Sequence, residues 1–234
     1  MKYEVHGEFA RLMFDSPEKA NALAPETLEE MDTLLGRAEE SDARAVVLTG
    51  EGEKFCAGAD IDAVADADGK EARDFADSLS RVLRKIETLD VPVISAVNGD
   101  AYGAGFETVV ASDLAVAAED ARLCLPATKL GLTPPLTPDR VGAVGGKKRA
   151  SEIALMGEPI DAETAESWGV VNCAVTHEKL EGTVESFISS IAEADREATR
   201  VTKKRIVSEG SDESVADRFA SDEARGRFSD AADR

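Results

Sequence analysis

The chain has 234 residues, which is enough for one large domain with a substantial core. It carries 47 acidic and 27 basic residues, a net charge of −20, and this argues against nucleic acid as a partner, because binding to phosphate relies on cations. No apolar run approaches the roughly 18 residues of a membrane helix, and the first residues lack the apolar core of a signal peptide. We therefore expect a cytoplasmic protein without a membrane segment.

Cysteine and histidine content limits the chemistry further. The three cysteines lack CxxC spacing, and the two histidines lie far apart in the sequence. We therefore expect no disulfide framework, no metal site and no Ser-His-Asp triad. The acidic residues are dispersed, and arginine (16) outnumbers lysine (11), which favours a protein adapted to a salt-rich cytoplasm. The alternative is an acidic protein without such an adaptation.

Apolar residues alternate between strand-like and helix-like spacing along the chain. Strands are expected at 9–14, 45–49, 91–97, 114–118, 122–125 and 170–175. Helices are expected from Pro25 to Ala38, over 74–89 and 149–156, from Gly103 to Ala111, and after Glu178 with a break at 209–212. The Gly/Pro-rich stretch 131–146 is expected to be a loop. Alternating strands and helices predict an α/β fold with a helical C-terminal part.

Two stretches of small residues follow predicted strands, at points where helices should begin. Ala57-Gly58-Ala59 precedes Asp60, and Gly103-Ala104-Gly105 lies just before Glu107. Unpaired N–H groups at a helix start can bind a developing oxyanion, and a nearby glutamate can act as a general acid or base. The alternatives are two tight packing turns, an Asp60 that only caps a helix, and a Glu107 that is a solvated surface acid.

These two stretches resemble the motifs of the crotonase family, which contains the enoyl-CoA hydratases and isomerases. The family motif FxAGxD matches Phe55–Asp60, and NGxxxGxGxE matches Asn98–Glu107. Segments 19–23 and 150–172 also resemble the family, so the resemblance covers nearly the whole chain. It implies a ClpP/crotonase-like spiral of ββα units in residues 1–178, followed by a C-terminal helical region in 179–234 that serves oligomerisation or pocket closure.

The resemblance also implies a set of site residues. The N–H groups of Ala59 and Ala104 would form an oxyanion hole for an acyl-CoA or enoyl-CoA thioester, with Glu107 as acid/base. Residues implied to contact the CoA ester are Lys19, Ala20, Asn21, Ala22, Leu23, Ala57, Gly58, Asp60, Ile61 and Gly103. Coenzyme A is part of the substrate, so no separate cofactor is expected. Lys19 and Lys54 are the candidates for contact with its phosphates. Packing of the C-terminal helices between subunits would give a homotrimer or hexamer.

One departure from the family leaves the reaction open. Hydratases of the family place a second glutamate after a proline at the end of a strand, and here the pair is Pro126-Ala127. Alanine cannot transfer a proton, so Thr133, Thr137 and Asp139 are considered as substitutes. The sequence predicts an enoyl-CoA hydratase or isomerase with a single Glu acid/base. The alternatives are a Δ3,Δ2-enoyl-CoA isomerase, an acyl-CoA hydrolase, and a non-catalytic acyl-CoA-binding or scaffold protein.

Overall fold

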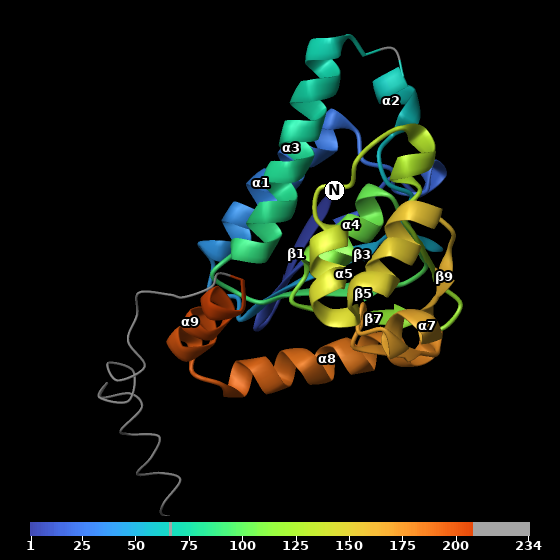
Figure 1. Cartoon of the computed structure of the whole chain (residues 1–234). Helices are drawn as coiled ribbons and strands as arrows, with labels where there is room; N and C mark the ends of the chain where they lie inside the picture. Colours follow the sequence, from blue (N-terminus) through green and yellow to red (C-terminus); the bar gives the residue numbers. More distant parts are fainter. Residues whose placement is uncertain (66, 208–234) are drawn as a thin grey trace, which may run out of the picture.

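Two sheets organise the computed structural model, which describes residues 1–65 and 67–207 (Figure 1). The larger sheet contains, in spatial order, β1 (Lys2–His6), β2 (Phe9–Phe14), β3 (Ala45–Gly50), β5 (Val93–Val97), β7 (Leu114–Ala118) and β10 (Cys173–Val175). The smaller sheet contains β4 (Lys54–Cys56), β6 (Asp100–Tyr102), β8 (Arg122–Cys124) and β9 (Ile160–Asp161). The pairs β1–β2 and β8–β9 are antiparallel, and the other pairs are parallel.

The chain winds through both sheets as a spiral. Strands β3, β5 and β7 are neighbours in the larger sheet, and the strands that follow each of them, β4, β6 and β8, are neighbours in the smaller one. Each repeat of the spiral therefore adds one strand to each sheet, and the chain then continues into a helical segment. This arrangement confirms the predicted α/β spiral of ββα units with a helical C-terminal region.

Helices cover both faces of the larger sheet (Figure 1). The α-helices are α1 (Pro25–Glu39), α2 (Ile61–Ala65), α3 (Gly69–Thr88), α4 (Ala104–Ala111), α5 (Thr137–Gly145), α6 (Lys147–Ser151), α7 (Ala162–Ser167), α8 (His177–Glu193) and α9 (Arg196–Val207). Short 3₁₀ segments lie at η1 (Pro17–Lys19) and η2 (Ala127–Leu130), and a π-helical turn follows α6 at η3 (Glu152–Met156). On one face, Leu180, Val184 and Ile188 of α8 pack against the sheet. The main apolar core fills the other side.

Several expected elements differ from those observed. The stretch 131–146, expected to be a loop, contains the helix α5, and the strand expected at 170–175 is only Cys173–Val175. The short strands β4 and β6 are present where the sequence indicated only turns. Three residues are too few for an alternating pattern to be recognised. The break expected at 209–212 lies outside the described residues, and the division at 178 stays a prediction.

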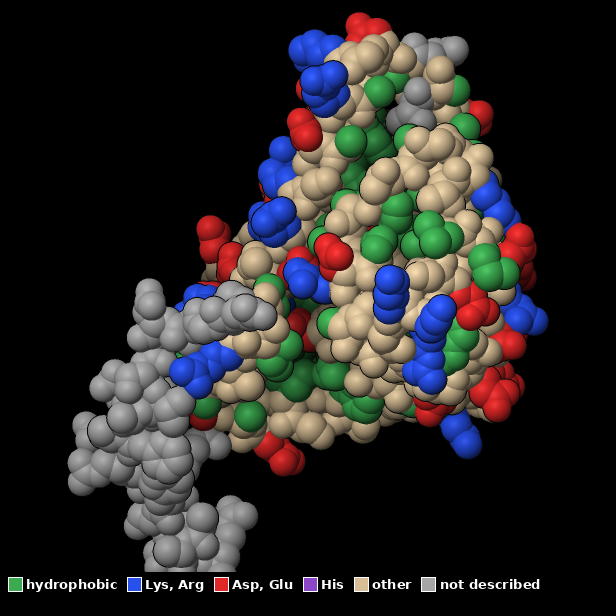
Figure 2. Space-filling view, viewed as in Figure 1, with side chains coloured by type: hydrophobic (Ala, Val, Ile, Leu, Met, Phe, Trp, Pro, Cys, Tyr) green, Lys and Arg blue, Asp and Glu red, His purple; other side chains and the backbone are tan. Residues whose placement is uncertain are grey.

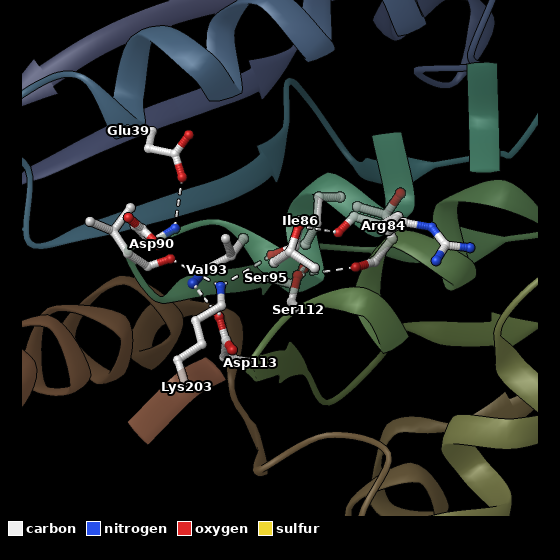
Figure 3. A network of polar contacts seen from close by, with 12 residues as sticks. Glu39, Arg84, Ile86, Asp90, Val93, Ser95, Ser112, Asp113 and Lys203 are labelled. Atoms are coloured by element: carbon white, nitrogen blue, oxygen red, sulfur yellow. Dashed lines mark hydrogen bonds and ion pairs between the residues drawn. The ribbon is translucent and has the colours of Figure 1, made fainter. Parts of the chain in front are cut away.

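A buried lysine attaches the last described helix to the core. Lys203 Nζ on α9 donates to Val91 O at 3.0 Å, to Ile86 O at 3.1 Å and to Asp113 Oδ2 at 2.6 Å (Figure 3). The same carboxylate oxygen accepts the Val93 N–H at 2.7 Å. Burial lowers the pKa of Lys203 and raises the pKa of Asp113, while their mutual attraction opposes both shifts. Among the described residues, no helix is long and apolar enough to cross a membrane.

Candidate active site

The first stretch of small residues is held in place by backbone pairing with segment 20–23. Leu23 N donates to Gly58 O at 2.7 Å, and Asp60 N donates to Leu23 O at 2.9 Å. Leu23 and Ala59 therefore form a parallel β-bridge in which the neighbours of Ala59 make both hydrogen bonds. Because successive peptide groups of an extended segment point to opposite sides, the Ala59 N–H points away from this bridge. In the described part of the chain, it donates no hydrogen bond.

The second stretch brings another unpaired amide next to the first. Ala104 is the first residue of α4, so its N–H has no acceptor within the helix, and no other acceptor is found among the described residues. Gly103 turns the chain into this helix with φ +52°, and its own N–H donates to Cys124 O at 2.8 Å. A Cβ atom on Gly58 (φ +98°) would lie 2.7 Å from Tyr102 O and 3.2 Å from Ala104 N. The two turns therefore touch, and only glycine fits at position 58.

Glu107 lies one helical turn after Ala104 and is 1% exposed. Its Oε2 atom accepts the N–H groups of Leu136 and Thr137, each at 3.1 Å. Its Oε1 atom is buried and has no hydrogen-bond partner among the residues that the structure describes. Burial raises the pKa of Glu107 from its ordinary 4.5 to about 7, although the two amide donors favour the ionised form. A carboxyl group with such a pKa can both take up and release a proton near neutral pH.

The two lysines considered for contact with CoA phosphates each carry a carboxylate partner. Lys19 Nζ lies 2.8 Å from Asp60 Oδ2, and Lys54 Nζ lies 2.6 Å from Asp100 Oδ2. The pairing raises the pKa of both lysines, mainly through the hydrogen bond to the carboxylate. Asp60 also accepts the Ala63 N–H at 3.3 Å, so it caps the start of α2 as expected. Its carboxylate thereby links segment 19–23 to the start of α2.

The side chain of Asn21 is fully used within the protein. It is 1% exposed, accepts the Ser16 N–H at 3.0 Å, and donates to Glu51 O at 2.9 Å and Lys54 O at 2.8 Å. Ala20 and Asn21 both adopt positive φ values, of 51° and 59°. In this conformation the amide of Asn21 holds the turn together, so the segment can offer a ligand its backbone but not this side chain.

The remaining predicted CoA-contact residues differ in exposure. Leu23 is fully buried, whereas Ile61 is 62% exposed at the start of α2. Ala57 is exposed and Ala22 is partly exposed, while Gly58 is buried between the two turns. Burial raises the pKa of the neighbouring Cys56 thiol to about 12, so it stays protonated and is a packing residue rather than a nucleophile.

The position of the family's second glutamate offers no acid here. Ala127 begins η2 and is partly buried against the core. Of the three substitutes considered, Thr133 and Asp139 are exposed, whereas Thr137 is fully buried and its backbone holds Glu107. The structure therefore brings Thr137 alone of these three to the Glu107 carboxylate. No local signal indicated the amides of Leu136 and Thr137, because they meet Glu107 across about thirty residues of sequence.

A cavity of about 440 Å³ opens between α1, α2 and α3. It is lined by Pro25, Glu29, Ala63, Ala67, Glu71, Asp74, Phe75 and Ser78. Figure 2 shows apolar side chains in the hollow beside the upper part of α3. Within residues 1–65 and 67–207, no three His, Cys, Asp or Glu side chains gather as they would around a metal ion.

Fold and site together define an α/β protein in which two amides without an acceptor among the described residues accompany a buried carboxyl group with a raised pKa. The enoyl-CoA hydratase/isomerase family model matches residues 4–233, and the chain therefore belongs to the enoyl-CoA hydratase/isomerase family. It is an acyl-CoA enzyme of this type.

Individual relatives agree with this assignment. The chain is 35% identical over 206 residues to a short-chain-enoyl-CoA hydratase of Clostridium acetobutylicum, covering 87% of this chain and 79% of that protein. It is 35% identical over 219 residues to a carnitinyl-CoA dehydratase of Citrobacter koseri, covering 88% and 82%.

Solved structures give the same result. An enoyl-CoA hydratase from Bacillus anthracis matches with a TM-score of 0.84 and 32% identity, covering 88% of this chain and 81% of that one. An enoyl-CoA hydratase from Mycobacterium smegmatis matches with a TM-score of 0.82 and 28% identity, covering 94% and 86%.

Proposed function

We propose that the protein catalyses the reversible hydration of short-chain enoyl-CoA thioesters, with the N–H groups of Ala59 and Ala104 as the oxyanion hole and Glu107 as the only acid/base. The observation that carries this proposal is the buried Glu107, with one free carboxylate oxygen, one helical turn from the unpaired amide of Ala104. Two donors aimed at a thioester oxygen stabilise the enolate that forms when C3 is attacked. One relative is named as a short-chain hydratase and another as a dehydratase, and both names support this reaction, because addition and removal of water are its two directions.

A single glutamate is sufficient for the whole proton balance. Ionised Glu107 takes one proton from a water molecule as the water oxygen forms its bond to C3. The electron pair of the double bond moves onto the thioester, where the two amides stabilise it as an enolate. Glu107 then gives the same proton to C2, so that water has been added and the enzyme is unchanged. Because one group acts on one face of the substrate, both new bonds form on that face.

Double-bond isomerisation is the second candidate, and Ala127 is the observation that favours it. In this reaction Glu107 removes a proton from one carbon of the acyl chain, so that an enolate forms. It then returns the proton to another carbon of the same chain. This reaction needs no water and no second acid. The oxyanion hole serves both reactions equally, so the product must decide between them.

The deciding experiment offers crotonyl-CoA to the purified protein in molar KCl and follows the enoyl-thioester absorbance and the products. We expect loss of absorbance with formation of 3-hydroxybutyryl-CoA. Glu107→Gln should lower kcat by a factor of at least about 10² while leaving the affinity for the CoA ester nearly unchanged, because it removes only proton transfer. Glu185→Gln, at an exposed position of α8, is the matched control.

The other outcomes separate the alternatives. Conversion of a 3-enoyl-CoA in place of crotonyl-CoA would indicate the isomerase, and release of free CoA would indicate the hydrolase. A protein that binds the ester but converts none of these substrates would be the non-catalytic acyl-CoA-binding or scaffold protein. Unchanged turnover in Glu107→Gln would remove the proposed site altogether.

Further properties belong to the same proposal. The C-terminal helical region would assemble a homotrimer or hexamer, which light scattering of the full chain tests.

Catalysis would need neither a metal nor a separate cofactor, so dialysis against EDTA should leave the turnover unchanged. The charge of −20 supports a salt-rich cytoplasm as the site of action and argues against nucleic-acid partners.

A further inference from the structure

Two buried oxygen atoms, which find no hydrogen-bond partner in residues 1–65 and 67–207, belong to residues that already contact each other. They are Glu107 Oε1 and Thr137 Oγ1, on side chains that are 1% and 0% exposed. A buried polar atom without a partner costs on the order of 1–3 kcal/mol, and such atoms are uncommon in folded proteins. The Thr137 side chain lies close enough to lower the pKa of Glu107, yet the two oxygen atoms do not reach normal hydrogen-bond geometry.

The other carboxylate oxygen of Glu107 is already engaged. Oε2 accepts two N–H groups, from Leu136 and Thr137. An oxygen with two N–H donors has little capacity left for a proton. The proton of neutral Glu107 therefore resides on Oε1, and Oε1 is the atom that exchanges it with a substrate.

We infer that Thr137 is a positioning residue for this proton: its hydroxyl donates to Oε1 when Glu107 is ionised and accepts from Oε1 when Glu107 is protonated. The inference rests on the proposed function and names the group that assists the single glutamate. The hydroxyl rotates between the two states and keeps its own proton, so no bond to Thr137 is made or broken. A hydroxyl group can serve both states because it is at once a donor and an acceptor.

The same residue supplies both contacts, which fixes the geometry. The backbone N–H of Thr137 holds Oε2 at 3.1 Å, and Thr137 is the first residue of α5, where the chain is ordered by the helix. The hydroxyl therefore cannot move far from the carboxylate. Thr133 and Asp139, which were considered from the sequence together with Thr137 as substitutes for the missing second acid, are exposed.

Other ionisable groups around α4 are themselves paired or neutral. On α3, Glu87 raises the pKa of Glu107, and it is paired at 2.5 Å with Arg140 of α5. On β4, burial holds the Cys56 thiol protonated, and on β6 burial raises the pKa of Tyr102. None of these groups provides a hydroxyl or amide to Oε1. Removal of the Thr137 hydroxyl should therefore be visible in the titration of Glu107.

The test compares Thr137→Val, which removes the hydroxyl at nearly constant volume, with Thr137→Ser, which restores it. The pKa of Glu107 is measured by NMR of its carboxyl carbon, identified by its absence in Glu107→Gln, and independently from the pH dependence of kcat/KM with crotonyl-CoA. We expect Thr137→Val to raise this pKa by about one pH unit, because the bond donated to the charged carboxylate is stronger than the bond accepted from the neutral acid. The value of kcat should fall by about tenfold with KM unchanged, and Thr137→Ser should recover most of both effects.

A Thr137→Val protein with the wild-type titration and pH profile would overturn the inference. If the Thr137→Val protein does not fold, Thr137→Ala removes the hydroxyl without steric conflict, and the same two readouts apply. The NMR titration tests the inference even if crotonyl-CoA is not the substrate. The proposed function fails separately, when Glu107→Gln retains turnover.

Discussion

Glu107 has two roles that make opposite demands on its protonation state. As the acceptor for the amides at the start of α5 it is stabilised when ionised, whereas its burial favours the neutral form. Burial is the larger effect, so its pKa lies at about 7 instead of 4.5. A pKa near neutral pH suits the acid/base role that we propose for Glu107, and the desolvation of its ionised form is a cost to the stability of the folded protein.

This cost predicts how Glu107→Gln changes stability with pH. The folded state holds the proton between pH 4.5 and about 7 while the unfolded state releases it, so the contribution of Glu107 is present below pH 4.5 and is lost as the pH rises to about 7. The full difference corresponds to about 3 kcal/mol. Urea unfolding should show Glu107→Gln gaining stability relative to wild type between pH 4.5 and 8, by up to this amount.

The control for this measurement is Glu185→Gln, which replaces an exposed glutamate on α8. Its stability difference from wild type should stay nearly constant over the same pH range. If Glu107→Gln behaved in the same way, the carboxyl group would not be desolvated in the folded protein, and its role as a poised acid/base would lose its physical basis.

At the level of single residues, sequence motifs indicated Ala59, Ala104 and Glu107 but not the surroundings of Glu107. Small residues before a helix are a local pattern, and the unpaired amides of Ala59 and Ala104 follow from it. The amides of Leu136 and Thr137 reach Glu107 only through the tertiary fold. The sequence therefore offered Thr137 only as one of three candidates to replace the missing second acid. The catalytic roles of these residues stay predictions until activity is measured.

At the level of elements, α5 shows why a helix was mistaken for a loop. Its N-cap residue, Leu136, forms no side-chain cap, and Gly and Pro residues surround it. The partner of its first amides is Glu107 of α4, which a local pattern cannot reveal. Strands β2, β3, β5 and β7 of the larger sheet and the long helices α1 and α3 were predictable because their apolar residues repeat over many positions.

Helix α9 provides a prediction about how the C-terminal region is attached. Lys203→Met removes the cation that faces Asp113, and leaves that carboxylate, within the described part of the chain, with backbone amide contacts such as that of Val93. Removing one member of a buried ion pair typically costs about 3–5 kcal/mol. Urea unfolding of the full chain should show a loss in this range.

Lys204→Met is the matched control on the neighbouring residue. Lys204 pairs with Asp90 at 2.8 Å where both side chains are about two-fifths exposed, and loss of an exposed pair of this kind should cost about 0–1 kcal/mol. Adding Asp113→Asn to Lys203→Met should restore part of the stability, because the unpaired charge is then gone. Equal effects of the two lysine variants would show that the contact in Figure 3 contributes no more than a surface ion pair.

At the level of the whole molecule, the net charge of −20 makes the protein sensitive to salt. We expect added salt to act on stability and on ligand binding in opposite directions. Figure 2 shows acidic and basic side chains intermixed on one face, so the excess is not confined to a single patch. Repulsion among carboxylates weakens as the Debye length falls from about 10 Å at 0.1 M salt to about 3 Å at 1 M. The same screening would weaken the proposed attraction between the phosphates of CoA and the cations Lys19 and Lys54, which also pair with Asp60 and Asp100.

We therefore expect added KCl to stabilise the protein and at the same time to raise KM for a CoA ester. Between 0.1 and 2 M KCl at pH 7.5, the urea midpoint should rise, because self-repulsion in the folded chain is relieved. At pH 4.5, near the isoelectric point, the remaining negative charges balance the positive ones, so the same salt step should have little effect on the midpoint. A rise of equal size at both pH values would mean that salt acts through the hydrophobic effect rather than through charge. A midpoint that does not change at pH 7.5 would show that the carboxylates are spaced widely enough to tolerate low salt, and the proposed salt-rich environment would lose its main physical support.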